Sequence, residues 1–479
     1  FREKFMYWSS EGPKKQEEKC CFVLISLHAR NDGLHGEVIL PSNLAFLTTK
    51  IKKEQGIMDI LKELKSFIIL WITQSFSALG SAMTNFALVI WLYNNSGSAL
   101  TTAMLTVCSY APYVVMSIFA GAISDRWSKK TVMLVCDSFA AICTVDVFVL
   151  LRSGSLEVWH LYVLNALNGL MNTIQQPASD VAITLLTPQK HYQKTSGMRS
   201  FSNSLVTILT PVFAAAFVSF AGIEAVIVFD LATFCIAFFV LLLFIKIPET
   251  ERKIEKSESI LQTAKSGLVF IKTNKGILWL ILFLAAINFI ASIYEAALPA
   301  MILSRSSEAV LGIINACVGI ATLAGSLIAT LTPAPKNRVN VICNCLLISM
   351  STENFFLSFG RSPAVWCTGA VLGWLFIPLM NANMDVIFRT KIPTEMLGRV
   401  YSVRNTLQFF TIPFGYFLGG LLVDKVFEPI MENTSSSFLR TLFGDGKGSG
   451  AAFLFFVIGI SGVVICLIFR NIKHIKKLK

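Results

Sequence analysis

Residues 276–303 read GILWLILFLAAINFIASIYEAALPAMIL, in which Glu295 is the single charged side chain. A run of this length can cross the roughly 30 Å of hydrocarbon in a bilayer as one helix. Its apolar residues follow one another without the alternation typical of a membrane-spanning strand. Only helices and closed barrels satisfy every backbone hydrogen bond in lipid. The stretch therefore predicts a transmembrane helix and, with it, an all-α membrane protein.

Similar apolar runs recur along the whole chain of 479 residues, of which 54% are hydrophobic and 15% charged. Soluble domains carry about 25% charged residues, so the composition alone favours a membrane protein. We predict twelve transmembrane helices in two pseudo-symmetric six-helix bundles. The predicted helices span residues 67–93, 99–123, 131–152, 158–186, 195–220, 223–245, 276–303, 308–332, 338–358, 363–388, 398–423 and 450–469.

Basic residues concentrate in the loops that follow the second, fourth, sixth, eighth and tenth predicted helices. Because cytoplasmic loops of membrane proteins are enriched in Lys and Arg, this bias predicts a cell-membrane protein with both termini in the cytosol. The basic tail 473–479 suits anionic lipid at that surface. The net charge of +12 is explained in this way. No basic domain stands apart from the membrane, and we expect no nucleic-acid partner.

Residues 1–57 form a mixed polar stretch without a long apolar run or a cleavable signal pattern. Met58 then opens the segment MDILKELK, directly before the first apolar run. We expect Met58 to be the true start and residues 1–57 to be a disordered or artefactual leader outside the family. The alternative is a genuine cytosolic tail, which N-terminal sequencing of the expressed protein would reveal.

The chain divides into an N-terminal bundle over 58–245, a cytosolic linker over 246–275, and a C-terminal bundle with its basic tail over 276–479. In the linker, apolar residues at near-helical spacing predict an amphipathic helix under the bundle. These residues are Ile260, Leu261, Ala264, Leu268 and Ile271.

The two predicted bundles are related by an internal repeat. Asp180 and Pro188 match Asp385 and Pro393 at a distance of 205 residues. A second set matches at a distance of 202 residues, which implies a change of three residues in the loop between them. It pairs Ser200, Asn203, Leu205 and Pro211 with Ser402, Asn405, Leu407 and Pro413. Parallel repeats of this kind place a substrate site near the midplane, between the halves.

The loop between the second and third predicted helices reads GAISDRWSKK from Gly121 to Lys130. It resembles the signature loop of the major facilitator superfamily, Gly-x-x-x-Asp-Arg-x-Gly-Arg-Arg. From Met58 on, the chain is similar to the branch of macrolide efflux proteins and enterobactin exporters. This similarity rests on Gln74, Ser77, Gly80, Pro177, Ala178, Asp230 and the segment 397–402.

The sequence departs from the family pattern in three places. Ser128 occupies the position of the second glycine in the signature loop. Asn168 lies near the position where many drug exporters carry an arginine, which puts a conventional proton relay through that helix in doubt. Thr210-Pro211 keeps the proline of the antiporter motif but lacks its glycines.

The resemblance implies a latch that holds the two halves together on the cytosolic side in one state of the transport cycle. We expect Asp180 and Asp385, as repeat mates, to exchange ion pairs with the basic loops. The alternative is ordinary surface ion pairs, each worth less than about 1 kcal/mol. The predicted latch residues are Asp125, Arg126, Lys129, Lys130, Asp180, Asp385 and Arg399.

Charged residues inside predicted spans are costly and mark candidates for proton coupling. Asp230 and Glu295 are our preferred candidates, because a desolvated carboxyl group there could carry a proton; the alternative is a static ion pair at an outer gate. Asp137 and Asp146 lie nine residues apart, which places them on opposite faces of one helix. We expect Asp137 to hydrogen bond within the bundle and retain Asp146 as a third candidate for coupling.

The resemblance implies a central cavity lined by the first, fourth, seventh and tenth predicted helices. A few polar groups in an apolar wall suit an amphipathic ligand. Interhelical hydrogen bonding is the alternative role for each of these side chains. The candidate cavity residues are Gln74, Asn85, Asn165, Asn168, Asn288, Asn381 and Asn383.

These observations predict a secondary active transporter that exports a small amphipathic compound, macrolide-like or siderophore-like, by alternating access and driven by the proton gradient. A lipid flippase or an uptake permease on the same fold remains an alternative, as does a non-transporting membrane sensor. No phosphate-binding loop, metal spacing or nucleophile–base pair is present, so we expect neither an enzyme nor a cofactor. The expected partners are the substrate and membrane lipids, with the protein as a monomer.

Overall fold

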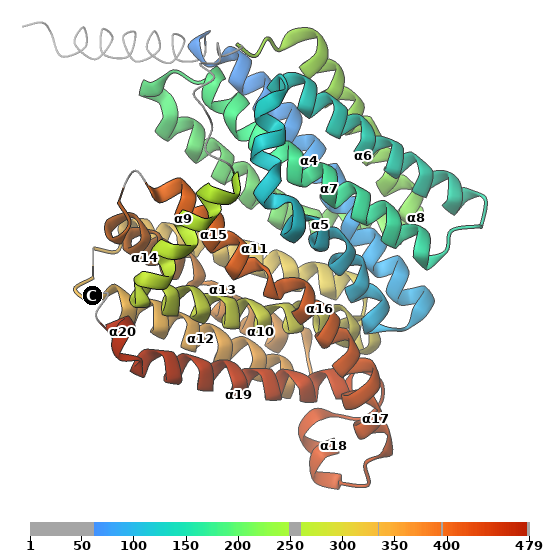
Figure 1. Ribbon diagram of the computed structural model, residues 1–479. Coiled ribbons are helices and arrows are strands. Elements are labelled where there is room, and N and C mark those ends of the chain that lie inside the picture. The colour runs from blue at the N-terminus through green and yellow to red at the C-terminus, as the bar shows by residue number, and fades with distance from the viewer. Residues whose placement is uncertain (1–61, 249–259, 334, 394–395, 477–479) are drawn as a thin grey trace, which may run out of the picture. The chain divides into compact units, whose positions relative to one another are not determined.

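The computed structural model describes residues 62–248, 260–333, 335–393 and 396–476. The leader 1–57 and the signal at Met58 lie outside these residues. The described chain is built from helices, which carry the labels of Figure 1. They are α4 (Lys65–Ser96), α5 (Ala99–Arg126), α6 (Lys129–Arg152), α7 (Val158–Leu186), η1 (Gln189–His191), α8 (Tyr192–Phe244), α9 (Ile260–Thr273), α10 (Lys275–Arg305), α11 (Glu308–Leu331), α12 (Arg338–Phe359), α13 (Pro363–Trp374), α14 (Ile377–Lys391), α15 (Leu397–Phe409), α16 (Thr411–Leu422), η3 (Val423–Phe427), α17 (Glu428–Asn433), α18 (Ser437–Phe443), α19 (Ser449–Asn471) and α20 (Lys473–Lys476).

Each predicted transmembrane segment coincides with helix. Within the described residues, ten helical stretches are long and apolar enough to cross a membrane. One of them, 197–244, contains two predicted helices, because α8 turns sharply at Gly222. The φ of 78° at Gly222 lies in the left-handed region, which glycine adopts at little cost. The predicted helix 158–186 corresponds to α7, which is not among the ten stretches.

The tenth and eleventh predicted helices are each interrupted. Leu375 and Phe376 separate α13 from α14, and Pro378, in the first turn of α14, has no N–H to continue the ladder of the preceding helix. Gly325 of α11 packs against this break so closely that an added Cβ would lie 2.0 Å from the Leu375 carbonyl oxygen. A break of this kind leaves backbone N–H and C=O groups without their partners in the helix, so that they can form hydrogen bonds with other groups inside the bundle.

The helices form two bundles in Figure 1. We call α4–α8 the first half and α10–α19 the second half. Buried side chains around Met83 and Leu92 form one apolar core of the first half, and a cluster around Met133 forms another. A larger core fills the second half around Phe283 and Phe455. Many other large apolar side chains are exposed, as expected for bundles whose outer faces meet lipid.

Glycines bring the two halves into close contact. In α11, Gly312 faces the Pro211 carbonyl and Gly319 faces Ile208, so that α11 packs on the first part of α8. In α16, Gly420 lies against the Leu100 backbone at the start of α5. The halves therefore meet through α8 and α11 and through α5 and α16. Two further glycines of α16 serve packing within the second half, since Gly415 and Gly419 face α10.

The linker contains the expected helix as α9. Its Gly267 packs on the Arg399 backbone of α15, and Ile271 is fully buried. Leu268, which the predicted apolar stripe included, is 47% exposed. Within the part of this helix whose side chains are described, the buried face is formed by Gly267 and Ile271, one helical turn apart.

Candidate functional site

The loops define two sides of the protein. The Gly97 side is where α4 joins α5, and the Ser128 side is where α5 joins α6. By the distribution of basic residues, the Ser128 side is the one predicted to face the cytosol.

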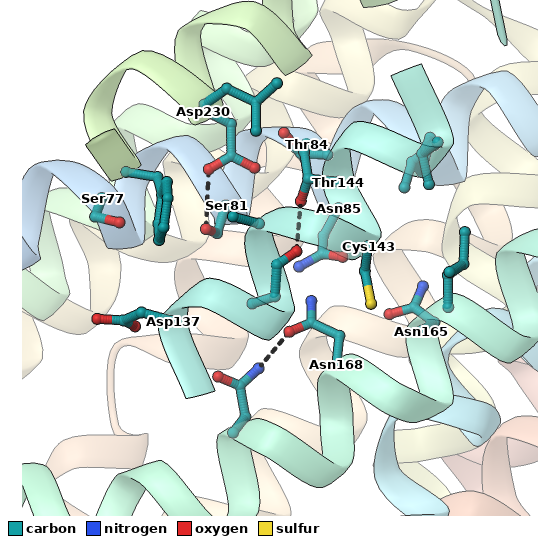
Figure 2. Close-up of a pocket in the computed structure, with 18 of the residues that line it drawn as sticks. Ser77, Ser81, Thr84, Asn85, Asp137, Cys143, Thr144, Asn165, Asn168 and Asp230 are labelled. Carbon is teal, nitrogen blue, oxygen red and sulfur yellow. Dashed lines mark hydrogen bonds between the residues drawn. The ribbon is translucent and has the colours of Figure 1, made fainter. Parts of the chain in front are cut away.

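The first half encloses two adjoining polar cavities of about 120 and 290 Å³. We treat them as one first-half cavity, because Ser77, Ser81, Asp137 and Gln175 line both. Its wall is polar, with Ser, Thr, Asn and Gln side chains from α4, α6 and α7 (Figure 2).

Two carboxyl groups line the first-half cavity. Asp230 of α8 is 4% exposed, and its Oδ1 accepts a hydrogen bond from Ser81 Oγ at 3.0 Å (Figure 2). Asp137 of α6 accepts one from Gln175 Nε2 at 2.5 Å. The opposite faces predicted for Asp137 and Asp146 are observed, since Asp146 is exposed and lines none of the described cavities. Asp137 and Asp230 thus lie together, and Asp146 lies apart.

The second half encloses a cavity of about 380 Å³, the second-half cavity, between α10, α12, α13, α14 and α15. Its wall is largely apolar, with Leu284, Ile287, Leu346 and Phe409 among the lining residues. Its charged or titratable lining groups come from three helices, α10, α12 and α15. They are Tyr294, Glu295, Glu353 and Arg404.

Glu353 of α12 is a buried carboxyl group that the sequence analysis passed over. It is 3% exposed, and its Oε1 accepts hydrogen bonds from the Tyr294 hydroxyl at 2.5 Å and from Trp374 Nε1 at 2.8 Å. Gly373 leaves room for it, because an added Cβ there would lie 2.6 Å from Glu353 Cβ. The sequence could have indicated Glu353, because it is an acidic residue inside the predicted transmembrane span 338–358, as Asp230 and Glu295 are in theirs.

Glu295 occupies a different position, at the boundary between cavities. It lines the second-half cavity and also a cavity of about 190 Å³ between the halves, formed by α4, α5, α10, α11 and α16. Among the described residues, neither a hydrogen-bond donor nor a cation contacts its carboxyl group. Asp230 and Glu295, our two preferred candidates for coupling, therefore lie in different halves.

The repeat mates Asp180 and Asp385 each face an arginine that the sequence analysis did not single out. Arg199 Nη2 donates to Asp180 Oδ1 at 2.6 Å. In the second half, Arg404 Nη1 lies 3.9 Å from Asp385 Oδ1. Lys130, one of the basic loop residues expected to pair with these aspartates, instead donates from Nζ to the Leu242 and Ile245 carbonyls at 2.8 Å each.

The remaining latch residues are described only partly. The side chains of Asp125 and Arg126 lie outside the described set, so the expected latch at the signature loop has no described geometry. Lys129 and Arg399 both have partners within the protein. Arg399 also contributes its backbone to the contact with α9.

Six of the seven candidate cavity residues line a described cavity. Gln74, Asn85, Asn165 and Asn168 line the first-half cavity, and Asn288 and Asn381 the second-half cavity. Asn383 instead accepts a hydrogen bond from Arg338 at 2.9 Å, which ties α14 to α12. Within the described residues, Gln74 Nε2 is buried without a hydrogen-bond partner, which suits a group that meets a ligand or water.

The two halves are hydrogen bonded to each other on the Gly97 side. Asp424 of η3 accepts from Ser98 Oγ at 2.5 Å, from the Ala99 N–H at 3.0 Å and from the Leu100 N–H at 2.9 Å. Its carboxylate thereby caps the first turn of α5, where unpaired N–H groups and the helix dipole favour a negative charge. No sequence signal connects Asp424 with Ser98, because the two residues belong to different halves.

A second contact on this side joins the end of α4 to the second half. The Tyr93 hydroxyl donates to the Ala300 carbonyl at 3.0 Å, and Asn94 Nδ2 donates to Glu308 Oε1 at 2.7 Å. Together with Asp424, these contacts join the two halves on the Gly97 side.

Two helical halves, cavities in each half with buried polar groups, and contacts that join the halves on one side indicate a membrane transporter. Residues 70–416 match the family model of the Major Facilitator Superfamily, and the chain belongs to this family. It is therefore a secondary transporter of a small molecule, a multi-pass membrane protein rather than an enzyme, and the predicted fold class is confirmed.

Similar sequences include Macrolide efflux protein A of Streptococcus pyogenes, 23% identical over 366 residues, which are 75% of this chain and 90% of that protein. Multidrug efflux pump Tap of Mycolicibacterium fortuitum is 22% identical over 359 residues, or 72% of this chain and 86% of that protein. Among solved structures, a variant of the nucleoside transporter NupG matches with a TM-score of 0.64 and 14% identity, covering 85% of this chain and 98% of that one. A bacterial homologue of the iron transporter ferroportin, in an inward-facing state, gives 0.61 and 15% identity, with 85% and 99% covered.

Proposed function

We propose that this chain is a proton-coupled exporter of a small amphipathic compound, such as a macrolide-like drug or a siderophore, working by alternating access. Export is supported by the sequence similarity to a macrolide efflux protein and a multidrug efflux pump. In this proposal the Ser128 side faces the cytosol, and the contacts on the Gly97 side belong to the state that is open to the cytosol. A role in antibiotic resistance follows if the substrate is a macrolide.

The observation that carries proton coupling is the environment of Glu295. This carboxyl group lines two cavities and contacts no cation among the described residues. An unpaired charge in such a position is costly, and binding a proton removes the charge. Because Glu295 lies at the boundary between the halves, movement of the halves can expose it to either side in turn. Asp230, held by Ser81, is the second group that we assign to proton transfer.

The test is proton flux in proteoliposomes that contain the full chain and a pH-sensitive dye. Erythromycin, a catechol siderophore and a lysolipid are added in separate experiments. We expect at least one compound to drive proton movement, and we expect Glu295→Gln to abolish this movement. Glu432→Gln, at an exposed position on α17, is the matched control and should leave the flux unchanged.

The proposal fails if none of these compounds moves protons, or if Glu295→Gln retains the flux of the unmodified protein. Flux with the lysolipid alone would replace export of a drug or siderophore by lipid transport on the same fold.

A further inference from the structure

Arg404 is a buried cation whose hydrogen-bonding groups are largely unused. It is 6% exposed and lines the second-half cavity. Its Nε donates to Gln408 Oε1 at 3.1 Å, and its Nη2 contacts only the Met384 sulfur, at 3.7 Å. Asp385, at 3.9 Å, lies beyond hydrogen-bonding distance of Nη1. A guanidinium has five N–H groups. Within the described part of the chain, acceptors engage only two of them.

In the first half, an arginine and an aspartate, Arg199 and Asp180, form a direct hydrogen-bonded ion pair. Arg199 follows Asp180 by 19 residues, as Arg404 follows Asp385, but the helix around them repeats in a different register. In that register Arg199 corresponds to Tyr401, and Arg404 corresponds to Ser202. Arg404 therefore lies three residues, or about 4.5 Å, further along its helix than the position equivalent to Arg199.

This shift changes the environment of the cation. Arg199 is partly exposed, with 36% of its side chain accessible, and it makes a close hydrogen bond to its carboxylate. Arg404 has 8% of its side chain accessible and its carboxylate at a distance. The ion pair of Arg404 with Asp385 therefore stabilises the protein less than that of Arg199 with Asp180, because a buried charge needs close, well-aligned partners to offset its desolvation.

Aromatic rings hold Arg404 in this position. Its Cζ lies 4.3 Å from the centre of the Phe388 ring and 5.3 Å from the centre of the Tyr401 ring. These cation–π contacts stabilise the charge and use none of its in-plane N–H groups. The guanidinium is thus fixed and remains able to bind a planar oxyanion through two parallel hydrogen bonds.

The remaining wall of the cavity limits the kind of ligand. Leu284, Ile287, Leu346 and Phe409 offer an apolar surface, and the two carboxyl groups, Glu295 and Glu353, come from α10 and α12. Glu353 is occupied by Tyr294 and Trp374. A ligand that fits these walls has an apolar body and one anionic group.

We propose that Arg404 binds the anionic group of an amphipathic substrate, a carboxylate, sulfonate or phosphate on an apolar body, in the second-half cavity. The proposal rests on the proposed function for the idea that this cavity takes the substrate, and it names the charge of that substrate. The binding itself requires no proton gradient.

The test measures binding of two related probes to the full chain in lipid nanodiscs. Anilinonaphthalene sulfonate carries one negative charge, and phenylnaphthylamine has the same ring system without the charge. Energy transfer from tryptophan, including Trp374 in the cavity wall, reports binding, and protein-free nanodiscs give the lipid background. We expect the unmodified protein to bind the sulfonate at least about tenfold more tightly than the uncharged probe, as suits one charge-assisted hydrogen-bonded pair.

Variants then assign this preference to one residue. Arg404→Gln should weaken binding of the sulfonate at least about tenfold and leave binding of the uncharged probe unchanged. Arg152→Gln, at an exposed position at the end of α6, is the matched control and should change neither. A double variant, Tyr401→Arg with Arg404→Ser, keeps one arginine but moves it to the register of the first half, and should lose the preference for the anion as Arg404→Gln does.

Equal affinity of the unmodified protein for the two probes would overturn the proposal, and this result does not depend on whether any variant folds. A preference for the anion that survives in Arg404→Gln or in the double variant would overturn it as well. The outcome is separable from that of the flux experiment, because binding is measured without a gradient. A preference that depends on Arg404 in a protein that moves no protons would refute proton coupling and leave the anion site standing.

Discussion

Replacing Asp424 by asparagine should open the Gly97 side. The asparagine oxygen can still accept from Ser98 Oγ and the Leu100 N–H, but its amide group then faces the Ala99 N–H, which loses its acceptor. One hydrogen bond is lost, at about 1 kcal/mol. Loss of the charge at the first turn of α5 adds about 0.5–1 kcal/mol. The total of about 1.5–2 kcal/mol should lower the ratio of closed to open populations roughly ten- to thirtyfold.

This shift can be measured as a distance between spin labels on the Gly97 side. Cysteines introduced by Ser155→Cys and Ser435→Cys, both at exposed positions, carry the labels in a background without the native cysteines. We expect Asp424→Asn to move the main distance to a longer value. Lys425→Gln, at the exposed neighbouring position, should leave the distribution unchanged. An unaltered distribution in Asp424→Asn would refute the view that this carboxylate holds the halves together.

Two further predictions concern stability. Gly169→Ala should lower the melting temperature, with a cost of about 1–3 kcal/mol, because the new Cβ would lie 2.1 Å from the Ser109 carbonyl oxygen and force α5 and α7 apart. Gly197→Ala, with no neighbouring atom within 4 Å, is the control and should be neutral or stabilising in tryptophan-monitored unfolding; equal melting temperatures for the two variants would contradict the packing argument. Hydrogen bonds from Lys190 Nζ at 2.8 Å and from His191 Nε2 at 3.0 Å lower the pKa of Glu63 from 4.5. A carboxyl group whose pKa is lowered by folding stabilises the folded state at pH values above its pKa in the unfolded chain. The melting temperature of Glu63→Gln should therefore lie below that of the unmodified protein at neutral pH, and the difference should vanish as the pH falls below 4.5. A difference that persists in acid would argue against an electrostatic origin.

Much of the fold could be predicted because lipid imposes strong rules on sequence. Long apolar runs locate the helices, and Gly222 falls in the predicted gap between 220 and 223. Polar side chains such as Asn85 and Asn288 could be proposed as lining residues because they are rare within spans, whereas Asn172 and Gln175 in the same walls were not singled out. What these rules leave open is the partner of each group, which depends on packing between distant segments.

The site shows this limit in particular residues. Ser98 Oγ donates a hydrogen bond to Asp424 at 2.5 Å, although the two residues are more than three hundred positions apart in the chain. Asp180 and Asp385 were predicted to pair with the basic loops, whereas the structure places Arg199 and Arg404, on the following helices, beside them. The register difference that buries Arg404 was visible as two repeat distances, 205 and 202, but its effect on the cation required coordinates.

The wide turn η3, over Val423–Phe427, carries Asp424 and holds one more residue per turn than a regular helix. Deleting a single residue there would restore ordinary winding and leave the segments on either side in nearly the same orientation, because the wide turn absorbs the extra residue. Only the side chains within the turn, that of Asp424 among them, would change direction. Related transporters can thus gain or lose this fastening by a one-residue insertion or deletion, without changing any charged side chain.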